Sequence, residues 1–237
     1  MKPGALVQFH ISTNDVGGSV SFYKLMGFKE LANGKKPFRW IAVSDGNLNI
    51  FLAEEEFYGL GYFDKNMEEK ASEIEGQGIE YVNKDLHMGD IWYKVVKDPN
   101  NFFIGLIEDT PEYLLNVNKN KFEPKGIFKE IGIVSDKIKE SVEFWKKFGF
   151  EIKNDSGKTS TSMRNGNMGI GLYKPNSSDH YFEGPALTFY DNNMPDIIRE
   201  LKDAGLDFQE EIKDNNGSLT GAVVLSPEGQ TFFLFKE

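Results

Sequence analysis

The sequence predicts an α+β protein made of four βαβββ units, two in each of two similar halves. Two observations support this prediction. Four short segments of the first half return in the same order in the second half. Within each half, helix-like spacing of apolar residues alternates with runs of short, strand-length apolar segments. A chain of 237 residues is also long enough for two domains of ordinary size.

The repeat defines the domains. Four segments of the first half match four of the second half: 19–28 matches 141–150, 45–52 matches 165–172, 62–81 matches 189–208, and 98–101 matches 226–229. Four matches in register predict a duplicated domain with small insertions. Between the copies lies a polar stretch that ends with Pro124 and Gly126, which is typical of a linker. We therefore predict a first domain over 1–116, a linker over 117–126 and a second domain over 127–237.

The elements of the first half follow from local patterns. Short apolar runs bounded by Gly, Asn, Asp or Lys predict strands, and apolar residues at helical spacing predict helices that end at a glycine such as Gly27. The predicted strands are 6–13, 28–31, 38–43, 48–52, 58–63, 79–82, 91–96 and 103–108, and the helices are 19–26 and 67–75. Thr110, Pro111 and Glu112 predict a short closing helix. In the second half, helices over 141–148 and 194–204 mark the same two units.

Composition excludes several classes of function. The formal net charge of −10 disfavours a nucleic-acid or anionic-membrane surface. The sequence has no cysteine, which excludes disulfides, thiolate catalysis and cysteine-ligated metal clusters. No apolar run approaches the roughly 20 residues of a membrane span, and the N-terminus lacks the apolar core of a signal peptide. We expect a cytoplasmic protein with no nucleic-acid or membrane partner.

Residues around the first predicted helix and the last predicted strand of each half match a known family. In the first half these are Asp15, Ser19, Phe22, Tyr23, Gly27, Phe28 and the turn 98–101, and in the second half Ser141, Phe144, Trp145, Gly149, Phe150 and the turn 226–229. With the four βαβββ units, they resemble the vicinal oxygen chelate superfamily of glyoxalases, bleomycin-resistance proteins and extradiol dioxygenases. The resemblance implies two glyoxalase-like domains with curved mixed sheets. Its motifs are structural, so they imply the fold more than the chemistry.

The resemblance also implies where metal ligands would lie. In metal-dependent members, His and Glu side chains face the concave side of the sheet from four strands. The corresponding positions in this chain are Gln8, Phe51, Tyr58 and Gly105 in the first half, and Glu130, Gly171, Pro185 and Phe233 in the second. Gly, Pro and Phe offer no ligand atom, and Gln and neutral Tyr are poor ligands for a catalytic divalent ion. We therefore expect no cofactor, with a divalent metal disfavoured.

Two polar residues, one on the first strand of each half, leave alternatives open. His10 lies two residues after Gln8, so both side chains share one face of the strand. It is either a base or ligand in a pocket, or a neutral histidine hydrogen-bonded within the sheet or at a domain interface. Glu130 is either a base with a pKa raised by burial or a structural carboxylate, and we favour the structural role. His87, His180 and the run 54–56 are predicted to be exposed.

With apolar residues at the ligand positions, the concave faces become aromatic-lined clefts that suit a small, partly aromatic or apolar molecule. The favoured function is metal-free binding of such a ligand. The alternative is a metal-dependent lyase, isomerase or dioxygenase with an atypical site, and a further one is that one domain is purely structural. We expect a monomer whose domains pair edge to edge, with a small-molecule ligand as its partner. The candidate ligand-binding residues are Gln8, His10, Phe51, Trp92, Glu130 and Phe233.

Overall fold

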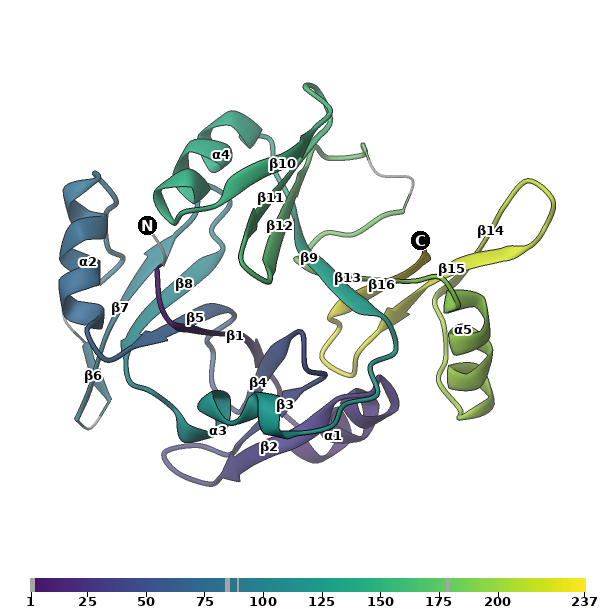
Figure 1. The fold of residues 1–237 in the computed structure, drawn as a ribbon, viewed down its shortest axis with the longest axis horizontal. Coiled ribbons are helices and arrows are strands. Elements are labelled where there is room, and N and C mark those ends of the chain that lie inside the picture. The colour runs from purple at the N-terminus through teal and green to yellow at the C-terminus, as the bar shows by residue number, and fades with distance from the viewer. Residues whose placement is uncertain (1–2, 84–85, 89, 178–179) are drawn as a thin grey trace.

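The computed structural model of the protein describes residues 3–83, 86–88, 90–177 and 180–237. In this part of the chain each half forms one eight-stranded mixed sheet, and the two long helices of each half pack against one face of its sheet (Figure 1). The order strand, helix, three strands occurs four times, which confirms the predicted α+β class and the βαβββ units. No helix in the described residues is both long enough and apolar enough to cross a bilayer.

The first sheet has the strand order β2-β3-β4-β1-β5-β8-β7-β6. Its two units meet at β1, which pairs in parallel with β4 and antiparallel with β5. The elements are β1 (Leu6–Ser12), α1 (Val16–Leu25), β2 (Lys29–Gly34), β3 (Trp40–Ser44), β4 (Asn49–Ala53), β5 (Gly59–Asp64), α2 (Met67–Gly76), β6 (Leu86–Met88), β7 (Ile91–Lys97) and β8 (Phe103–Glu108).

Two short helices, α3 (Glu112–Leu115) and the 3-10 helix η1 (Val117–Lys119), lead to the second sheet, whose order β10-β11-β12-β9-β13-β16-β15-β14 repeats that of the first. The first sheet ends at Glu108 and the second begins at Ile127, while the exact domain boundaries stay a prediction. The elements are β9 (Ile127–Val134), α4 (Ile138–Lys147), β10 (Glu151–Asp155), β11 (Ser160–Asn165), β12 (Met168–Tyr173), β13 (Ala186–Asp191), α5 (Met194–Asp203), β14 (Glu210–Lys213), β15 (Leu219–Leu225) and β16 (Thr231–Lys236).

Three element predictions need correction, and one of them is helix α4, which begins at Ile138 and not at 141. Helix α1 begins three residues before the predicted start at 19, because the side chain of Asp15 accepts hydrogen bonds from the backbone N–H groups of Gly17 and Gly18 and so caps the helix. The predicted strand over 79–82 is wrong. That segment contains one isolated bridge, from Tyr81 to Val96, and β6 supplies the third strand of the unit.

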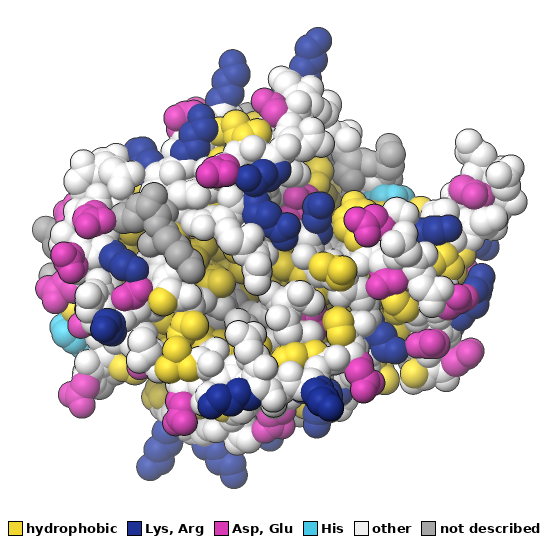
Figure 2. Space-filling view, in the orientation of Figure 1, with side chains coloured by type: hydrophobic (Ala, Val, Ile, Leu, Met, Phe, Trp, Pro, Cys, Tyr) yellow, Lys and Arg dark blue, Asp and Glu magenta, His cyan; other side chains and the backbone are white. Residues whose placement is uncertain are grey.

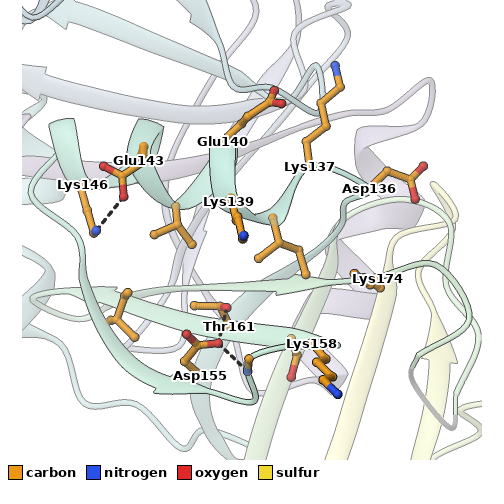
Figure 3. A pocket seen from close by; sticks show the side chains of 15 residues that line it. Asp136, Lys137, Lys139, Glu140, Glu143, Lys146, Asp155, Lys158, Thr161 and Lys174 are labelled. Atoms are coloured by element: carbon orange, nitrogen blue, oxygen red, sulfur yellow. Dashed lines mark hydrogen bonds and ion pairs between the residues drawn. The ribbon is translucent and has the colours of Figure 1, made fainter.

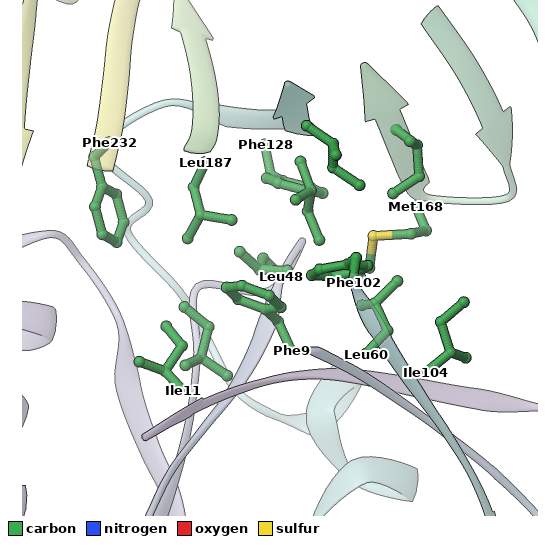
Figure 4. Packing of buried hydrophobic residues seen from close by; sticks show 14 of the residues in the cluster. Phe9, Ile11, Leu48, Leu60, Phe102, Ile104, Phe128, Met168, Leu187 and Phe232 are labelled. Carbon is green, nitrogen blue, oxygen red and sulfur yellow. The ribbon is translucent and has the colours of Figure 1, made fainter. Parts of the chain in front are cut away.

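The two sheets pack face to face. Among the described residues, every strand pairs within its own half, so the edge-to-edge prediction is wrong. Burial of apolar surface gains about 25 cal/mol per Å², and the apolar side chains lie on the sheet faces rather than along the edges. One cluster therefore joins both halves (Figure 4), and it includes Phe9, Leu60, Phe128, Leu187 and Phe232.

Helices α1 and α4 extend this interface. The ring centroids of Phe22 and Tyr23 on α1 lie 5.4 and 5.9 Å from that of Phe232 on β16. In the opposite direction, the ring of Trp145 on α4 lies 6.3 Å from that of Phe102. The two halves therefore share a single core.

A buried carboxyl in the turn between β3 and β4 should make the stability depend on pH. Asp45 accepts hydrogen bonds from the N–H groups of Asn47 and Leu48, both at 2.7 Å, and burial raises its pKa to about 6. The folded protein therefore keeps this proton at pH values where the unfolded chain has lost it. The contribution of Asp45 to the free energy of unfolding should therefore fall as pH rises from about 4 to about 6, and then level off.

Asp45→Asn keeps the acceptor oxygen and removes the titration. Relative to the unsubstituted protein, we expect this variant to gain stability between pH 4 and pH 7, by up to about 3 kcal/mol, since one pKa unit corresponds to about 1.4 kcal/mol. Urea unfolding at pH 4, 5, 6 and 7 measures the difference. A difference that does not change with pH would show that the Asp45 carboxyl ionises as it does in water.

Candidate functional site

Each sheet has one face turned away from the shared core, and we call these faces the first cup and the second cup. Because side chains alternate along a strand, Gln8 and His10 of β1 lie on the first cup while Phe9 enters the core. On β9, Glu130 and Gly132 occupy the corresponding positions of the second cup.

Aromatic side chains fill the first cup around His10. The ring centroids of Phe51, Phe57 and Phe63 lie 4.8, 5.3 and 6.2 Å from that of the imidazole. His10 is 7% exposed, and neither ring nitrogen has a hydrogen-bond partner among the described residues. Its Nδ1 lies 3.8 Å from Oε1 of Glu55, whose side chain is 25% exposed and not fully exposed as predicted. The hydrogen-bonded histidine of our structural alternative is not observed.

Helix α3 closes the first cup. The Tyr113 hydroxyl donates to Oε1 of Gln8 at 3.2 Å, and the Tyr113 ring lies 6.1 Å from the ring of Trp40. Leu114 packs with Phe63 in a satellite apolar cluster. Burial raises the pKa of Tyr113 to about 12, so its hydroxyl stays protonated and continues to donate at neutral pH. The chain itself therefore seals the cup that holds Gln8 and His10.

A buried carboxylate lies in the second cup. Glu130 is 5% exposed, its Oε2 accepts a hydrogen bond of 2.9 Å from the Ser162 hydroxyl, and its Oε1 accepts one from the Tyr173 hydroxyl. Burial, followed by the charge of Glu130, raises the pKa of Tyr173 well above its ordinary value, so this phenol stays a donor. In the described structure, no Lys, Arg or His side chain lies within ion-pair distance of Glu130.

The backbone around Glu130 is irregular. Thr188 on β13 pairs with Glu130, but the next residue, Phe189, pairs with Phe128, so Lys129 has no opposite residue and β9 bulges. The equivalent pairing of β1 with β5 is regular. Bulges re-aim side chains and are common beside active sites. On the other side of β9, a Cβ added at Gly171 would lie 2.3 Å from Glu130 Oε1, so glycine leaves the room that the carboxylate needs.

Aromatic rings form the wall beside Glu130. The ring centroid of Phe182 lies 5.9 Å from that of Tyr173 and 5.5 Å from that of Phe233. Phe182 also lines an adjoining cavity of about 480 Å³, together with Lys174 and other residues of the segment after β12. The second half, as far as it is described, has no counterpart of α3. Instead, the segment after β12 covers part of the second cup, where Phe182 packs against Phe233.

The sequence-predicted site residues lie in three places. Gln8, His10 and Phe51 share the first cup. Glu130 and Phe233 share the second, where Thr188 pairs with both. Trp92 lies in the shared core cluster instead.

Sequence reasoning did not single out Ser162 or the bond of Tyr173 to Glu130. Alternation from Gly171 along β12 would have indicated Tyr173. The turn between β11 and β12 fixes the pairing that places Ser162 opposite Gly171. Both residues were therefore within reach of the sequence once the hairpin was recognised.

Strand pairing corrects two of the predicted ligand positions. Gly61 lies opposite Gln8 and Thr188 lies opposite Glu130, in place of Tyr58 and Pro185. Tyr58 precedes β5, and its hydroxyl bonds to Gln230 of the other half. Tyr58 was wrongly placed because β5 starts one residue later than predicted, and its pairing with β1 decides which of its residues face the cup.

The remaining histidines differ from each other. His87 is exposed, as predicted. The His180 side chain is only 18% exposed, with Nδ1 3.3 Å from Oε1 of Glu210 and its ring centroid 5.7 Å from that of Phe235. The prediction of an exposed His180 is therefore wrong, because the segment after β12 folds back against β16.

A larger cavity, of about 700 Å³, lies outside both cups between α4 and the β10–β11 hairpin (Figure 3). Ile138, Val142 and Ile152 line it, and exposed charged side chains of both signs surround them, including the Lys146–Glu143 ion pair of 2.7 Å. Figure 2 shows similar mixed charge over much of the surface, with hydrophobic side chains around the hollowed centre. Exposed ion pairs are weak, and the charged groups lining this cavity are all exposed, unlike Glu130.

Comparisons with solved structures show the fold. The Mn(II)-bound glyoxalase from Novosphingobium aromaticivorans superposes with a TM-score of 0.66 at 11% identity, covering 100% of this chain and 83% of that chain. The E323L mutant of homoprotocatechuate 2,3-dioxygenase from Brevibacterium fuscum gives a TM-score of 0.66 at 14% identity, with 100% and 72% coverage. A mutant of 4-hydroxymandelate synthase from Streptomyces coelicolor gives 0.65 at 12% identity, with 100% and 93% coverage.

The chain also matches a xylose isomerase-like TIM barrel/4-hydroxyphenylpyruvate dioxygenase fusion protein, with a TM-score of 0.64 at 13% identity, but spans only 49% of its length. No family model and no curated protein matches the sequence. The structural likenesses show that the chain has the vicinal oxygen chelate fold that the resemblance implied.

These likenesses overturn the expectation that no cofactor is involved, because a glyoxalase with this fold is Mn(II)-bound. The cups of this chain provide a separate test of fit. Catalytic divalent ions are usually held by three protein ligands from His, Asp and Glu. Glu130 pairs with Thr188 and bonds to Ser162 and Tyr173, none of which is a His, Asp or Glu. Among the described residues, His10 has Glu55 as its one carboxylate neighbour within ion-pair distance. The described residues contain no group of three or more such ligands, so they do not fit a three-ligand metal centre.

Proposed function

We propose that this protein is an enzyme that acts on a small molecule in the second cup, with Glu130 as the proton acceptor. The observation that carries the proposal is a buried carboxylate held by two hydroxyl groups and lacking a cationic partner among the described residues. A carboxylate has about four acceptor positions, so positions remain for a bound molecule. The structural neighbours are named as a glyoxalase, dioxygenases and a synthase, which supports an enzymatic role.

Ser162 and Tyr173 have positioning roles in this proposal. Their hydroxyls fix the two carboxylate oxygens, and the raised pKa of Tyr173 keeps its hydroxyl protonated. A general base must lie within hydrogen-bond reach of the proton that it removes. The bulge in β9 and the absence of a side chain at Gly171 hold Glu130 in its place on the cup.

We assign a structural role to the first cup. Gln8 takes the position of Glu130 there, carries no charge, and is already bonded to Tyr113 of the closing helix. The phenyl rings around His10 fill the space in which a ligand would have to lie. The cytoplasmic location and the monomeric state stay predictions.

Metal-dependent chemistry is a second candidate, and the Mn(II)-bound glyoxalase of the same fold favours it. Glu130, or His10 with Glu55, would be the donors in this chain, and each set falls short of three protein ligands. A titration with Mn(II), monitored by electron paramagnetic resonance, tests this second candidate. One tightly held ion per chain would support this candidate, and only weak, multiple binding would count against it.

We expect Glu130→Gln to weaken the binding of small polar fragments at least tenfold, and Tyr173→Phe to weaken it severalfold. A hydrogen bond to a charged group is worth about 1.5–3 kcal/mol, roughly a factor of 10 to 150 in affinity. Calorimetric titration of fragments that bind the unsubstituted protein measures the loss. Tyr113→Phe is the matched control, because it removes the equivalent phenol hydroxyl from the first cup.

The proposal fails if fragment affinity is unchanged in Glu130→Gln. It fails equally if Tyr113→Phe has the larger effect, which would place the ligand in the first cup. A fragment screen in which nothing binds the second cup also contradicts it.

A further inference from the structure

We propose that the second cup selects a positively charged organic molecule, an amine or guanidinium attached to an apolar group. This inference rests on the proposed function, because it names the class of molecule that Glu130 would meet. Three independent observations lead to it: the charge balance around Glu130, the rings beside it, and the net charge of the chain.

The first observation is an uncompensated charge. A buried carboxylate is costly unless it is both hydrogen-bonded and paired with a cation. Glu130 has the hydrogen bonds, from Ser162 and Tyr173, but both donors are neutral. The described residues place no cationic side chain within ion-pair distance of it. An ammonium or guanidinium group entering the cup would supply the missing charge.

The second observation is the aromatic wall. Tyr173, whose hydroxyl bonds to Glu130, also packs against Phe182, and Phe182 packs against Phe233. Aromatic faces attract organic cations, with about 0.5–2 kcal/mol for each well-placed ring. The rings also accommodate the apolar part of such a molecule. A hydrated divalent ion gains little from rings and requires several oxygen ligands, so the wall favours an organic cation.

The third observation concerns the whole chain. The formal net charge of −10 raises the local concentration of cations and repels anions. Lys174, His180 and Glu183 line the adjoining cavity, and Oε1 of Glu210 lies 3.3 Å from Nδ1 of His180, so groups of both signs lie there. The first cup serves as an internal contrast, since its equivalent of Glu130 is the neutral Gln8.

Three probes that share one ring test the charge preference: benzylamine, benzyl alcohol and benzoate. We expect benzylamine to bind the second cup at least tenfold more tightly than benzyl alcohol, and benzoate to bind most weakly. Glu130→Gln should bring the affinity for benzylamine down to that for benzyl alcohol, while Tyr113→Phe leaves the ranking unchanged. Calorimetry gives the affinities, and the shift of the Tyr173 ring signal in NMR identifies the cup.

The probe series on the unsubstituted protein does not depend on how any variant folds. If benzyl alcohol binds the second cup as tightly as benzylamine, the charge inference is overturned while the proposed function stands. If none of the probes shifts the Tyr173 signal, the proposed function is contradicted as well. Mn(II) is added as a competitor, and stoichiometric displacement of benzylamine by Mn(II) would overturn the choice of an organic cation.

Discussion

Replacing Phe232 with alanine is expected to lower the free energy of unfolding by about 3–5 kcal/mol, the range measured for buried phenylalanines. Phe232 is fully buried, and its ring contacts those of Phe22 and Tyr23 from the other half of the chain and that of Phe189 beside it. The cavity left by Phe232→Ala would therefore lie between the two sheets, where neither half can close it alone.

Phe235→Ala is the matched control. Phe235 lies on the same strand, but on the second cup, and is only half-buried against Tyr190 and Phe233. We expect Phe235→Ala to lower the free energy of unfolding by about 1 kcal/mol, because Phe235 buries less apolar surface than Phe232. Urea unfolding followed by tryptophan fluorescence measures both variants. Equal losses for Phe232→Ala and Phe235→Ala would contradict a core shared between the halves.

Gly59→Ala is expected to cost about 3 kcal/mol, at the upper end for overpacked sites. Gly59 lies between β1 and β8, opposite His10 and Phe103. A Cβ at this position would lie 2.1 Å from the backbone oxygen of Phe103, and backbone cannot move aside as a flexible side chain does. The substitution should therefore push β5 away from β8, its neighbour in the first sheet.

Gly105→Ala provides the control on the neighbouring strand. The nearest atom to an added Cβ there is Cζ of Phe57 at 3.4 Å, an ordinary contact. We expect a change of less than about 1 kcal/mol, since alanine also loses less backbone entropy on folding than glycine. Thermal unfolding of the two variants compares them. A tolerated Gly59→Ala would show that β5 and β8 are less closely spaced at this point.

The sequence predicted the architecture well, because duplication leaves a signal that no single segment carries. The match of 19–28 with 141–150 fixed both helix positions to within a few residues, and the resemblance placed Glu130 on the first strand of the second half. Alternation then correctly put Gln8 and His10 on one face of β1. Each of these inferences depends on residue spacing within or between matching segments, which a sequence records directly.

The inferences that went wrong depend on contacts between distant segments. Trp92 lies in the shared core, because the face that β7 presents is set by its pairing with β8. Tyr58 was placed in the first cup although its hydroxyl reaches Gln230 of the other half. The closing of the first cup by Tyr113 brings together residues 105 positions apart in the sequence. Local spacing does not encode such contacts.

The second cup is the proposed working cleft, and one tyrosine in each cup reports on that cup separately. Tyr173 bonds to Glu130 in the second cup, and Tyr113 bonds to Gln8 in the first. With carbon-13 label in the tyrosine rings, NMR spectra are recorded as a binding molecule such as benzylamine is added. We predict that the Tyr173 signal shifts with saturation while the Tyr113 signal stays in place. A saturating shift of Tyr113 with Tyr173 unchanged would contradict the account.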